Sequence, residues 1–213
     1  MELEFQILGA YPADGMAFWF VEEPYQPGSA FGYKENFRGL GIFMDTYKNN
    51  HGNGNNYPRI GAMIGDGLRK FDHYNDGRDQ ELASCQADIV NTESPIRLRV
   101  VYVHDILEVY WRNHNGDFDH KWKKCFIVVD VKLPKKAYIG VTAQTGAFSA
   151  RHRLMLLEAM TLSLSDLRSY EAHHKLLKHS GSFSTGLIYF VIIVGIIGIG
   201  IYWNEQLTKR HNF

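Results

Sequence analysis

The sequence has no net charge, because 23 lysines and arginines balance 23 aspartates and glutamates. Binding to nucleic acid needs a basic face for the phosphates, so this balance argues against a nucleic-acid partner. A signal peptide is not recognisable: residues 1–9 alternate polar and apolar side chains and show neither a basic n-region nor an apolar h-region. Internal repeats are not visible either. At 213 residues the chain is long enough for one domain and an appendage.

Cysteine is scarce, with Cys85 and Cys125 as the two examples. Such residues can pair in an oxidising lumen, whereas in the cytosol they remain free thiols. Sequence spacing decides neither outcome, because a disulfide depends on how closely two residues approach in space. Aromatic residues are abundant at 14% of the chain, which suits the core of a β-sandwich and a sugar-stacking surface.

One hydrophobic run, residues 187–203, carries no charged side chain. Its length is at the short end of what a membrane-spanning helix needs, and Tyr202 and Trp203 lie where an aromatic belt would form. The alternative is a buried core helix, which would show a polar stripe that this run lacks. We therefore expect a transmembrane helix over 187–203 and a short tail over 204–213, whose basic pair fits the cytoplasmic side.

Most of the remaining sequence alternates as β-strands do or forms short apolar runs between turn residues. The predicted strands cover residues 2–8, 15–22, 40–45, 60–64, 68–71, 97–103, 106–111, 126–131, 137–143 and 154–164. The fourth and fifth are predicted to form a hairpin around Gly65-Asp66-Gly67. Strands this short and this regularly spaced predict an antiparallel β-sandwich. A short helix is predicted over 166–178, capped by Ser165 or Asp166, with a flexible linker over 180–186.

Two oxygen-rich segments follow hydrophobic runs, at Asp45–Asn50 and Asp72–Asp76. Oxygen ligands of this kind bind Ca²⁺ in proteins. The candidate ligands are Asp45, the carbonyl of Tyr47, Asn49 and Asp76. The segment is not an EF-hand, because Asn50 and Asn56 stand where that loop needs glycine and glutamate. The alternative is that these residues are ordinary turn formers, and that the nearby His73 is a surface residue.

Four segments resemble a known family. The first is similar to the Ala-Asp-Gly motif of legume lectins and the apolar strand after it, and it reads Pro12-Ala13-Asp14-Gly15-Met16-Ala17-Phe18-Trp19-Phe20. The segments at residues 43–49, 71–77 and 82–85 look like the animal and fungal branch of that superfamily. Its members are membrane-bound L-type lectins that carry glycoproteins between endoplasmic reticulum and Golgi. The resemblance extends from about residue 2 to about residue 164.

The resemblance implies an all-β fold, a concanavalin-like, jelly-roll antiparallel sandwich. It divides the chain into an L-type lectin domain at 1–164, a short helical stalk and linker at 165–186, the transmembrane helix at 187–203 and the cytoplasmic tail at 204–213. The family has several dozen residues before its strand at residues 2–8, so this domain is expected to lack the early strands. A chain whose span is C-terminal could instead insert as a tail anchor, with the lectin domain in the cytosol.

The resemblance also implies a site. Its calcium ligands match Asp45, the Tyr47 carbonyl, Asn49 and Asp76, and its mannose contacts match Asp14, Asn49 and His73. It further implies a cis peptide bond between Ala13 and Asp14 and a disulfide between Cys85 and Cys125. A third sugar-contacting loop corresponds to Gly146-Ala147-Phe148, where the family usually reads Gly-Asp-Leu or Gly-Gly-Leu. Backbone donors survive that change, whereas a carboxylate contact does not.

The expected function is that of a calcium-dependent lectin for high-mannose N-glycans on glycoprotein cargo. By resemblance it is a single-pass type I protein of the endoplasmic reticulum, the intermediate compartment or the Golgi, with a lumenal lectin domain. The tail, which ends in Phe213, is a candidate site for vesicle coat proteins. One alternative is a glycoside hydrolase on the same sandwich, but the usual Glu-x-Asp-x-x-Glu strand is absent, so we expect no enzyme. Another is a trafficking adaptor that has lost sugar binding.

Overall fold

The computed structural model describes residues 1–50, 57–113 and 121–172. The chain separates into two units, Met1–Ala159 and Met160–Phe213. The strands found among the described residues all belong to the first unit. They are β1 (Glu2–Leu8), β2 (Gly15–Val21), β3 (Arg38–Asp45), β4 (Arg59–Asp66), β5 (Ala83–Gln86), β6 (Ile96–Val103), β7 (Ile106–Asn113), β8 (Lys123–Val128), β9 (Tyr138–Gln144) and β10 (Arg151–Glu158).

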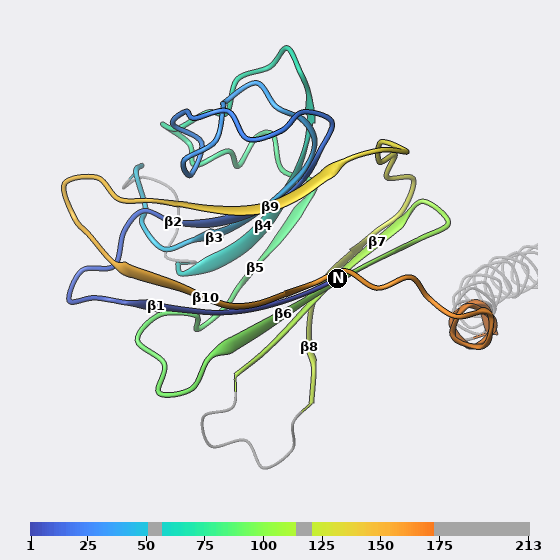
Figure 1. Cartoon of the computed structure of the whole chain (residues 1–213). Helices are drawn as coiled ribbons and strands as arrows, with labels where there is room; N and C mark the ends of the chain where they lie inside the picture. Colours follow the sequence, from blue (N-terminus) through green and yellow to red (C-terminus); the bar gives the residue numbers. More distant parts are fainter. Residues whose placement is uncertain (51–56, 114–120, 173–213) are drawn as a thin grey trace, which may run out of the picture. The chain divides into compact units, whose positions relative to one another are not determined.

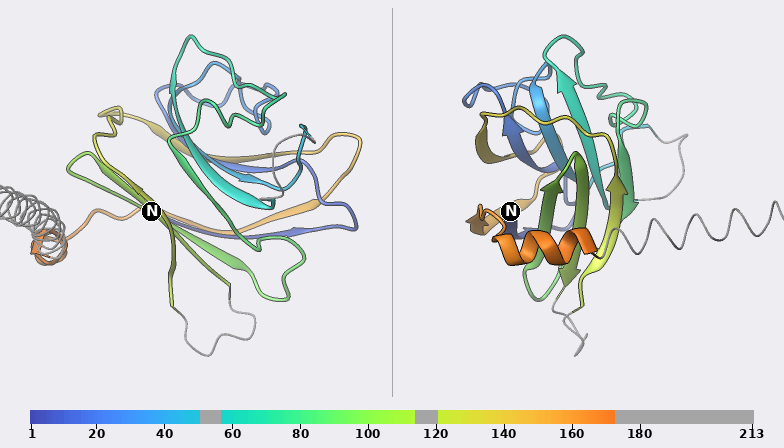
Figure 2. Two further views of the ribbon diagram at one scale, coloured as in Figure 1. Left: turned by 180° about the vertical axis from the view of Figure 1, so that it is seen from behind. Right: turned by 90° about the vertical axis from the view of Figure 1, so that its right-hand side faces the viewer.

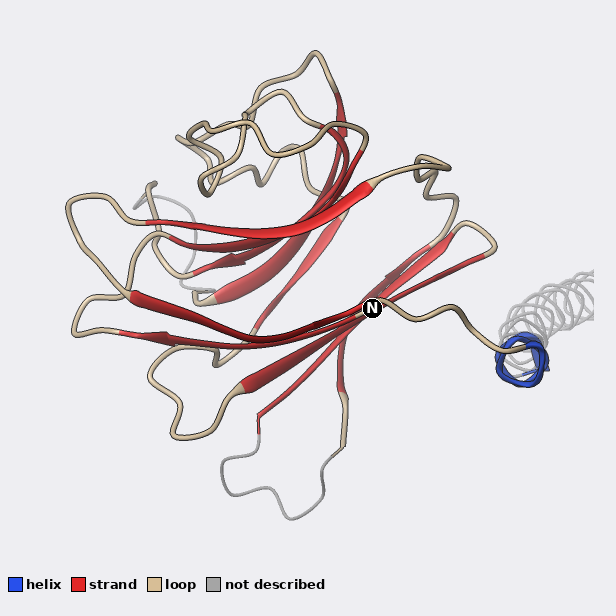
Figure 3. Cartoon of the chain, viewed as in Figure 1, coloured by secondary structure: helices blue, strands red, loops and turns tan. Residues whose placement is uncertain are grey.

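These strands form two five-stranded sheets that face each other (Figure 1). One sheet has the order β10-β1-β6-β7-β8 and the other β5-β4-β3-β2-β9, and neighbouring strands are antiparallel throughout. The two layers can be followed from behind and from the side in Figure 2, and Figure 3 shows that strands and loops make up the first unit. The predicted all-β sandwich is confirmed.

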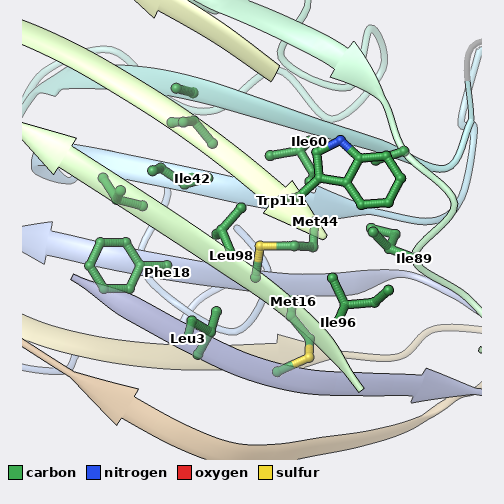
Figure 4. Packing of buried hydrophobic residues seen from close by; sticks show 14 of the residues in the cluster. Leu3, Met16, Phe18, Ile42, Met44, Ile60, Ile89, Ile96, Leu98 and Trp111 are labelled. Carbon is green, nitrogen blue, oxygen red and sulfur yellow. The ribbon is translucent and has the colours of Figure 1, made fainter. Parts of the chain in front are cut away.

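The main core lies between the two sheets, and the alternation of strand side chains explains it. In β6, Ile96, Leu98 and Val100 are buried, whereas Arg97 and Arg99 between them point outward and form ion pairs with glutamates of β1. The inward residues of the facing strands β2, β3 and β4 meet them; Figure 4 shows Met16, Phe18, Ile42, Met44 and Ile60 in this cluster. The alternation of side chains along each strand therefore determines which face of each sheet packs into the main core.

A second, largely aromatic cluster covers the other face of the β2–β4 sheet. Its members are Ala17, Trp19, Val21, Ala30, Phe31, Tyr33, Phe37, Phe43, Met63 and Phe71. Several come from the loops that lie over this sheet (Figure 1). Strand β2 thus has both faces buried, with Met16 and Phe18 in the main core and Trp19 in the aromatic cluster. This is why residues 16–21 read as a nearly continuous apolar run.

The predicted hairpin between residues 60–64 and 68–71 is wrong. Strand β4 continues to Asp66 and pairs with β3 and β5. The Asp66 carboxylate then accepts hydrogen bonds from the backbone N–H groups of Leu68 and Arg69, both at 2.8 Å. This local turn ends the strand and sends the chain over the sheet, so residues 68–71 form no strand.

Two further predictions need correction. Strand β5 was missed because it has four residues and little apolar character. The last strand, predicted over 154–164, occupies Arg151–Glu158 instead, and a helix begins at residue 164. Ser163, rather than Ser165 or Asp166, caps this helix: its Oγ accepts a hydrogen bond from the Asp166 N–H at 3.1 Å, and the Asp166 side chain accepts one from the Ser163 N–H at 3.3 Å.

The helix is described over 164–172. The rest of the predicted helix and the expected linker, membrane span at 187–203 and tail at 204–213 lie outside the described residues. Within the described part of the chain, no helix has the length and apolar character that crossing a membrane requires.

Cys85 of β5 and Cys125 of β8 form a disulfide, with their Cα atoms 5.3 Å apart. The bond joins an edge strand of one sheet to an edge strand of the other. The pairing that the family resemblance implied is therefore confirmed.

Removing this disulfide is expected to lower the free energy of unfolding by about 2–4 kcal/mol, because a link between residues 40 apart restricts the unfolded chain. The double variant Cys85→Ser, Cys125→Ser is compared with wild type in urea, with unfolding followed by tryptophan fluorescence. Wild type treated with a reducing agent serves as the control and should match the variant. Equal unfolding midpoints for oxidised wild type and variant would contradict the prediction.

Candidate functional site

Three strand ends meet at one edge of the β2–β3–β9 sheet and build the base of the site. Gly15 at the start of β2 pairs with Asp45 at the end of β3. Asp14 is fixed on both sides, because its N–H donates to the Gln144 carbonyl at 2.9 Å and its carbonyl accepts from the Thr46 N–H at 3.0 Å. Position 15 needs glycine, since its φ is +143° and a Cβ atom there would lie 2.2 Å from the Met44 carbonyl oxygen. The predicted cis peptide bond between Ala13 and Asp14 is confirmed.

The second oxygen-rich segment folds against the first. Asp76 accepts hydrogen bonds from the Asn49 N–H, at 3.3 and 3.2 Å to its two oxygens, and from the Tyr57 hydroxyl at 2.7 Å. Asp45 accepts one from the Tyr47 N–H at 3.2 Å. Asp45 and Asp76 are only 4% and 6% exposed. Two carboxylates from distant parts of the chain are therefore buried next to each other.

The electrostatics of this pair favour a cation. Burial raises the pKa of Asp45 well above its usual range, and the neighbouring charge of Asp76 raises it further, against the opposing effect of Arg59. Arg59 itself forms an ion pair with Glu81, which limits how far it neutralises Asp45. A bound divalent cation would relieve both the burial cost and the mutual repulsion of the two carboxylates.

The donor set fits a hard cation such as Ca²⁺. Within residues 1–50, 57–113 and 121–172, no three His, Cys, Asp or Glu side chains form a group that could hold a metal. The two aspartates therefore need other oxygen donors. The Asn49 amide nitrogen donates to the His73 carbonyl at 3.0 Å, which leaves the amide oxygen as the end of that side chain able to bind an ion. With the carbonyl of Tyr47, the set then consists of oxygens alone, as Ca²⁺ prefers.

His73 is held by a residue that the sequence did not point to. Its Nε2 lies 3.0 Å from Glu35 Oε1, and its ring packs edge-on against Phe71 with 5.1 Å between ring centroids. Glu35 also accepts a hydrogen bond from the Ser29 hydroxyl at 2.7 Å and pairs with Lys70 at 3.3 Å. These partners lower the pKa of Glu35, so it stays ionised beside the imidazole. No local pattern around Glu35 marks it, because its role comes from a loop that folds over the sheet.

These residues surround one cavity of about 320 Å³. Six residues that the sequence proposed as site residues line it: Asp14, Asp45, Tyr47, Asn49, His73 and Asp76. The rest of the lining consists of Ser29, Phe31, Phe71, Tyr74 and Gln144. Burial raises the pKa of Asp14 above its usual value, and the opposing effect of the nearby His73 is smaller. The cavity thus places a carboxylate, an amide and an imidazole beside the oxygen donors that fit Ca²⁺. This arrangement can hydrogen-bond a ligand rich in hydroxyl groups.

The third predicted loop lies beside this cavity and not in its lining. A Cβ atom on Gly146 would be 3.4 Å from Asp14 Oδ2, so this residue is next to the candidate sugar contact. Ala147 and Phe148 line a neighbouring cavity that also includes Tyr11. The sequence did not point to Tyr11, because a single exposed tyrosine in a loop carries no signal of its own.

Comparison with known proteins identifies relatives. The legume-like lectin family matches residues 1–168. A VIP36-like protein from Pongo abelii is 31% identical over 225 residues, which cover 92% of this chain, and mouse vesicular integral-membrane protein VIP36 is 37% identical over 153 residues, which cover 71%. The chain spans 63% and 41% of the length of these two relatives. A crystal structure of the VIP36 exoplasmic/lumenal domain in its Ca²⁺/Man2-bound form superposes with a TM-score of 0.68 at 33% identity, covering 75% of this chain and 67% of that one.

Proposed function

The chain belongs to the legume-like lectin family, and from this premise we propose that it is a calcium-dependent lectin that binds high-mannose N-glycans on glycoprotein cargo. The observation that carries the proposal is the single cavity shared by Asp14, Asn49 and His73 with the buried carboxylates Asp45 and Asp76. The related VIP36 domain, solved with Ca²⁺ and Man2, supports the choice of ion and sugar. Its relatives are lectins rather than enzymes, and no catalytic role is proposed.

Some of these residues would bind the ion and others the sugar. Asp45, the Tyr47 carbonyl, Asn49 and Asp76 would hold Ca²⁺, which supplies positive charge that fixes the two loops. Asp14 accepts hydrogen bonds from sugar hydroxyls, and His73 and Asn49 face the same ligand from the opposite loops. Glu35 orients His73. The Gly146-Ala147-Phe148 loop contributes backbone donors beside Asp14.

We assign the cellular context by the same relationship. The lectin domain at 1–164 lies in the lumen of the endoplasmic reticulum, the intermediate compartment or the Golgi, followed by the stalk and linker at 165–186, a membrane span at 187–203 and a cytoplasmic tail at 204–213 that binds vesicle coat proteins. Two observations support this. The Cys85–Cys125 disulfide suits an oxidising lumen, and the mouse relative is named a vesicular integral-membrane protein.

Glycan binding is expected to depend on Ca²⁺. The full chain is applied to a glycan array with Ca²⁺ and with a chelator, and high-mannose glycans should be retained only with Ca²⁺, because the sugar-binding loops depend on the ion. Asn49→Ala should lose both Ca²⁺ and glycan binding, since Asn49 serves both. Asp88→Ala, which removes an exposed carboxylate outside the cavity, should bind as wild type does.

A second candidate function is a trafficking adaptor without sugar binding. It is favoured by one observation, that position 147 is Ala where the family usually has Asp or Gly. The same array separates the two candidates. Wild type that binds no glycan with or without Ca²⁺ would contradict the lectin proposal and favour the adaptor.

A further inference from the structure

A buried arginine lies next to the two carboxylates of the proposed calcium site. Arg59 at the start of β4 is the register partner of Asp45 at the end of β3, and opposed residues of antiparallel strands place their side chains on the same face of the sheet. Arg59 and Asp45 are each 4% exposed, and Asp76 is 6% exposed. A fixed positive charge is therefore enclosed together with two negative charges.

Arg59 does not cancel either carboxylate by direct pairing. Among the described residues, its ion pair is formed with Glu81, and its Nε and Nη1 atoms are buried without a hydrogen-bond acceptor. The pair packs over Gly61, where a Cβ atom would lie 2.9 Å from Arg59 Nη2 and 3.0 Å from Glu81 Oε2. Glu81 also accepts a hydrogen bond from the Ser84 hydroxyl at 2.9 Å. Glu81 thus holds the guanidinium in place while part of its donor capacity stays unused.

Tyr57 connects this arginine to the second carboxylate. The guanidinium groups of Arg59 and Arg78 lie 5.8 and 5.3 Å from the centroid of the Tyr57 ring, and the Tyr57 hydroxyl donates to Asp76 at 2.7 Å. Burial and the charge of Asp76 raise the pKa of Asp45, and the charge of Arg59 opposes them. Arg59 therefore acts on the carboxylates through its electric field, and it does so without lining the cavity.

We propose that Arg59 is a resident counter-charge that sets the calcium affinity of the site: it stabilises the buried carboxylates while the ion is absent and repels the ion when it binds. The inference rests on the proposed lectin function, because it concerns the same calcium site. In a protein interior, where water and salt screen weakly, a unit charge acts on its neighbours without touching them. Removing this charge should leave a more negative site that binds a divalent cation more tightly.

Two opposite effects follow from this one residue. Without Ca²⁺, Arg59 offsets part of the repulsion between Asp45 and Asp76, which favours the folded arrangement of the segments that carry them. With Ca²⁺, the same positive charge repels the ion, so the affinity falls below that of the two carboxylates without the arginine. Glu81 moderates both effects, because it is the ion-pair partner of Arg59. Calcium-free stability and calcium affinity should therefore change in opposite directions when Arg59 is neutralised.

Two substitutions that break the same ion pair with opposite changes of charge test the proposal. Arg59→Met removes the positive charge and keeps a long apolar side chain, whereas Glu81→Gln removes the negative charge and keeps an oxygen acceptor. Calorimetric titration of the full chain with Ca²⁺ should show about tenfold tighter binding by Arg59→Met. Glu81→Gln should bind Ca²⁺ about threefold more weakly, because it leaves the charge of Arg59 uncompensated. A purely structural role of the pair would weaken calcium binding in both variants.

Two further variants control for charge and for the state without the ion. Arg59→Lys keeps the charge and should bind Ca²⁺ within about threefold of wild type. Arg97→Met is the matched control, because it removes an arginine that pairs with Glu4 on the outer face of the other sheet, and it should leave calcium affinity unchanged. In chelator, Arg59→Met should unfold at a lower temperature than wild type, and added Ca²⁺ should raise its unfolding temperature by more than that of wild type.

Weaker or unchanged calcium binding by Arg59→Met would overturn the proposal while the lectin function stands, and so would an equal gain in affinity by Arg97→Met. If Arg59→Met does not fold even with Ca²⁺, Glu81→Gln decides alone: weaker calcium binding supports the proposal, and unchanged or tighter binding overturns it. Wild type that binds no Ca²⁺ would instead refute the proposed function and this inference with it.

Discussion

Replacing Asp45 with alanine is expected to lower the affinity for Ca²⁺ more than about 100-fold, because even groups that only orient metal ligands cost 10–100-fold when removed. Asp45 is 4% exposed and ends β3 directly beneath the cavity. Its loss leaves Asp76 as the remaining carboxylate of the proposed calcium set. Mannose binding should disappear together with the ion, because the bound Ca²⁺ holds the loop that carries Asn49 in its sugar-binding position.

Thermal unfolding measures this effect without any sugar. At a Ca²⁺ concentration about 100 times its dissociation constant, wild type should gain about 2.7 kcal/mol of stability, because the ion binds the folded state alone. Asp45→Ala should gain almost nothing at that concentration. Asp88→Ala, the exposed control, should gain as much as wild type. A variant at position 45 that keeps the full calcium-induced shift would remove Asp45 from the proposed set.

The Asp14→Ala variant is expected to separate sugar from metal. It should lose mannose binding by more than about 100-fold, because a carboxylate that accepts two sugar hydroxyls contributes about 1.5–3 kcal/mol per hydrogen bond. Its calcium affinity should change less than about threefold. Asp14 is held in place by backbone hydrogen bonds to Gln144 and Thr46, so the loop geometry does not depend on its side chain.

Titration calorimetry with Ca²⁺ and then with methyl α-mannoside measures both affinities on one sample. Asp14→Asn is the graded control; it keeps one oxygen acceptor and should bind mannose with intermediate affinity. Unchanged mannose binding by Asp14→Ala would place the sugar elsewhere. Loss of calcium and mannose together would instead make Asp14 part of the metal site.

Much of the sandwich could be predicted from the sequence, because the pattern of apolar residues in each strand indicates which of its faces are buried. Alternation in Ile96–Val103 marks one buried face, and the continuous apolar run of β2 marks two. Errors arose where short-range signals were weak or ambiguous. Strand β5 has four residues with little apolar character, and the segment after Asp66 looks like a returning strand although a side-chain-to-backbone turn ends β4 there.

The candidate site likewise contains residues that could be proposed from the sequence and one that could not. Asp45 and Asp76 could be proposed as ligands because oxygen-rich segments at strand ends are visible in the sequence, and the family resemblance added Asp14 and His73. Glu35 could not be found, because it meets His73 through a loop folded over the sheet. Spacing alone also left open whether Asp45 and Asp76 were ligands or turn formers, since turn residues and metal ligands are the same residue types.

The amino-acid order therefore fixes which side chains carry the chemistry, which strand faces are buried and where strands end, since these depend on neighbours along the chain. The folded arrangement alone brings Asp14 beside Asp45, through the pairing of β2 with β3, and buries Asp45 with Asp76. It also places Tyr11 against Phe148. Such contacts join residues far apart in the chain, and they depend on strand register and loop packing, which no local pattern records.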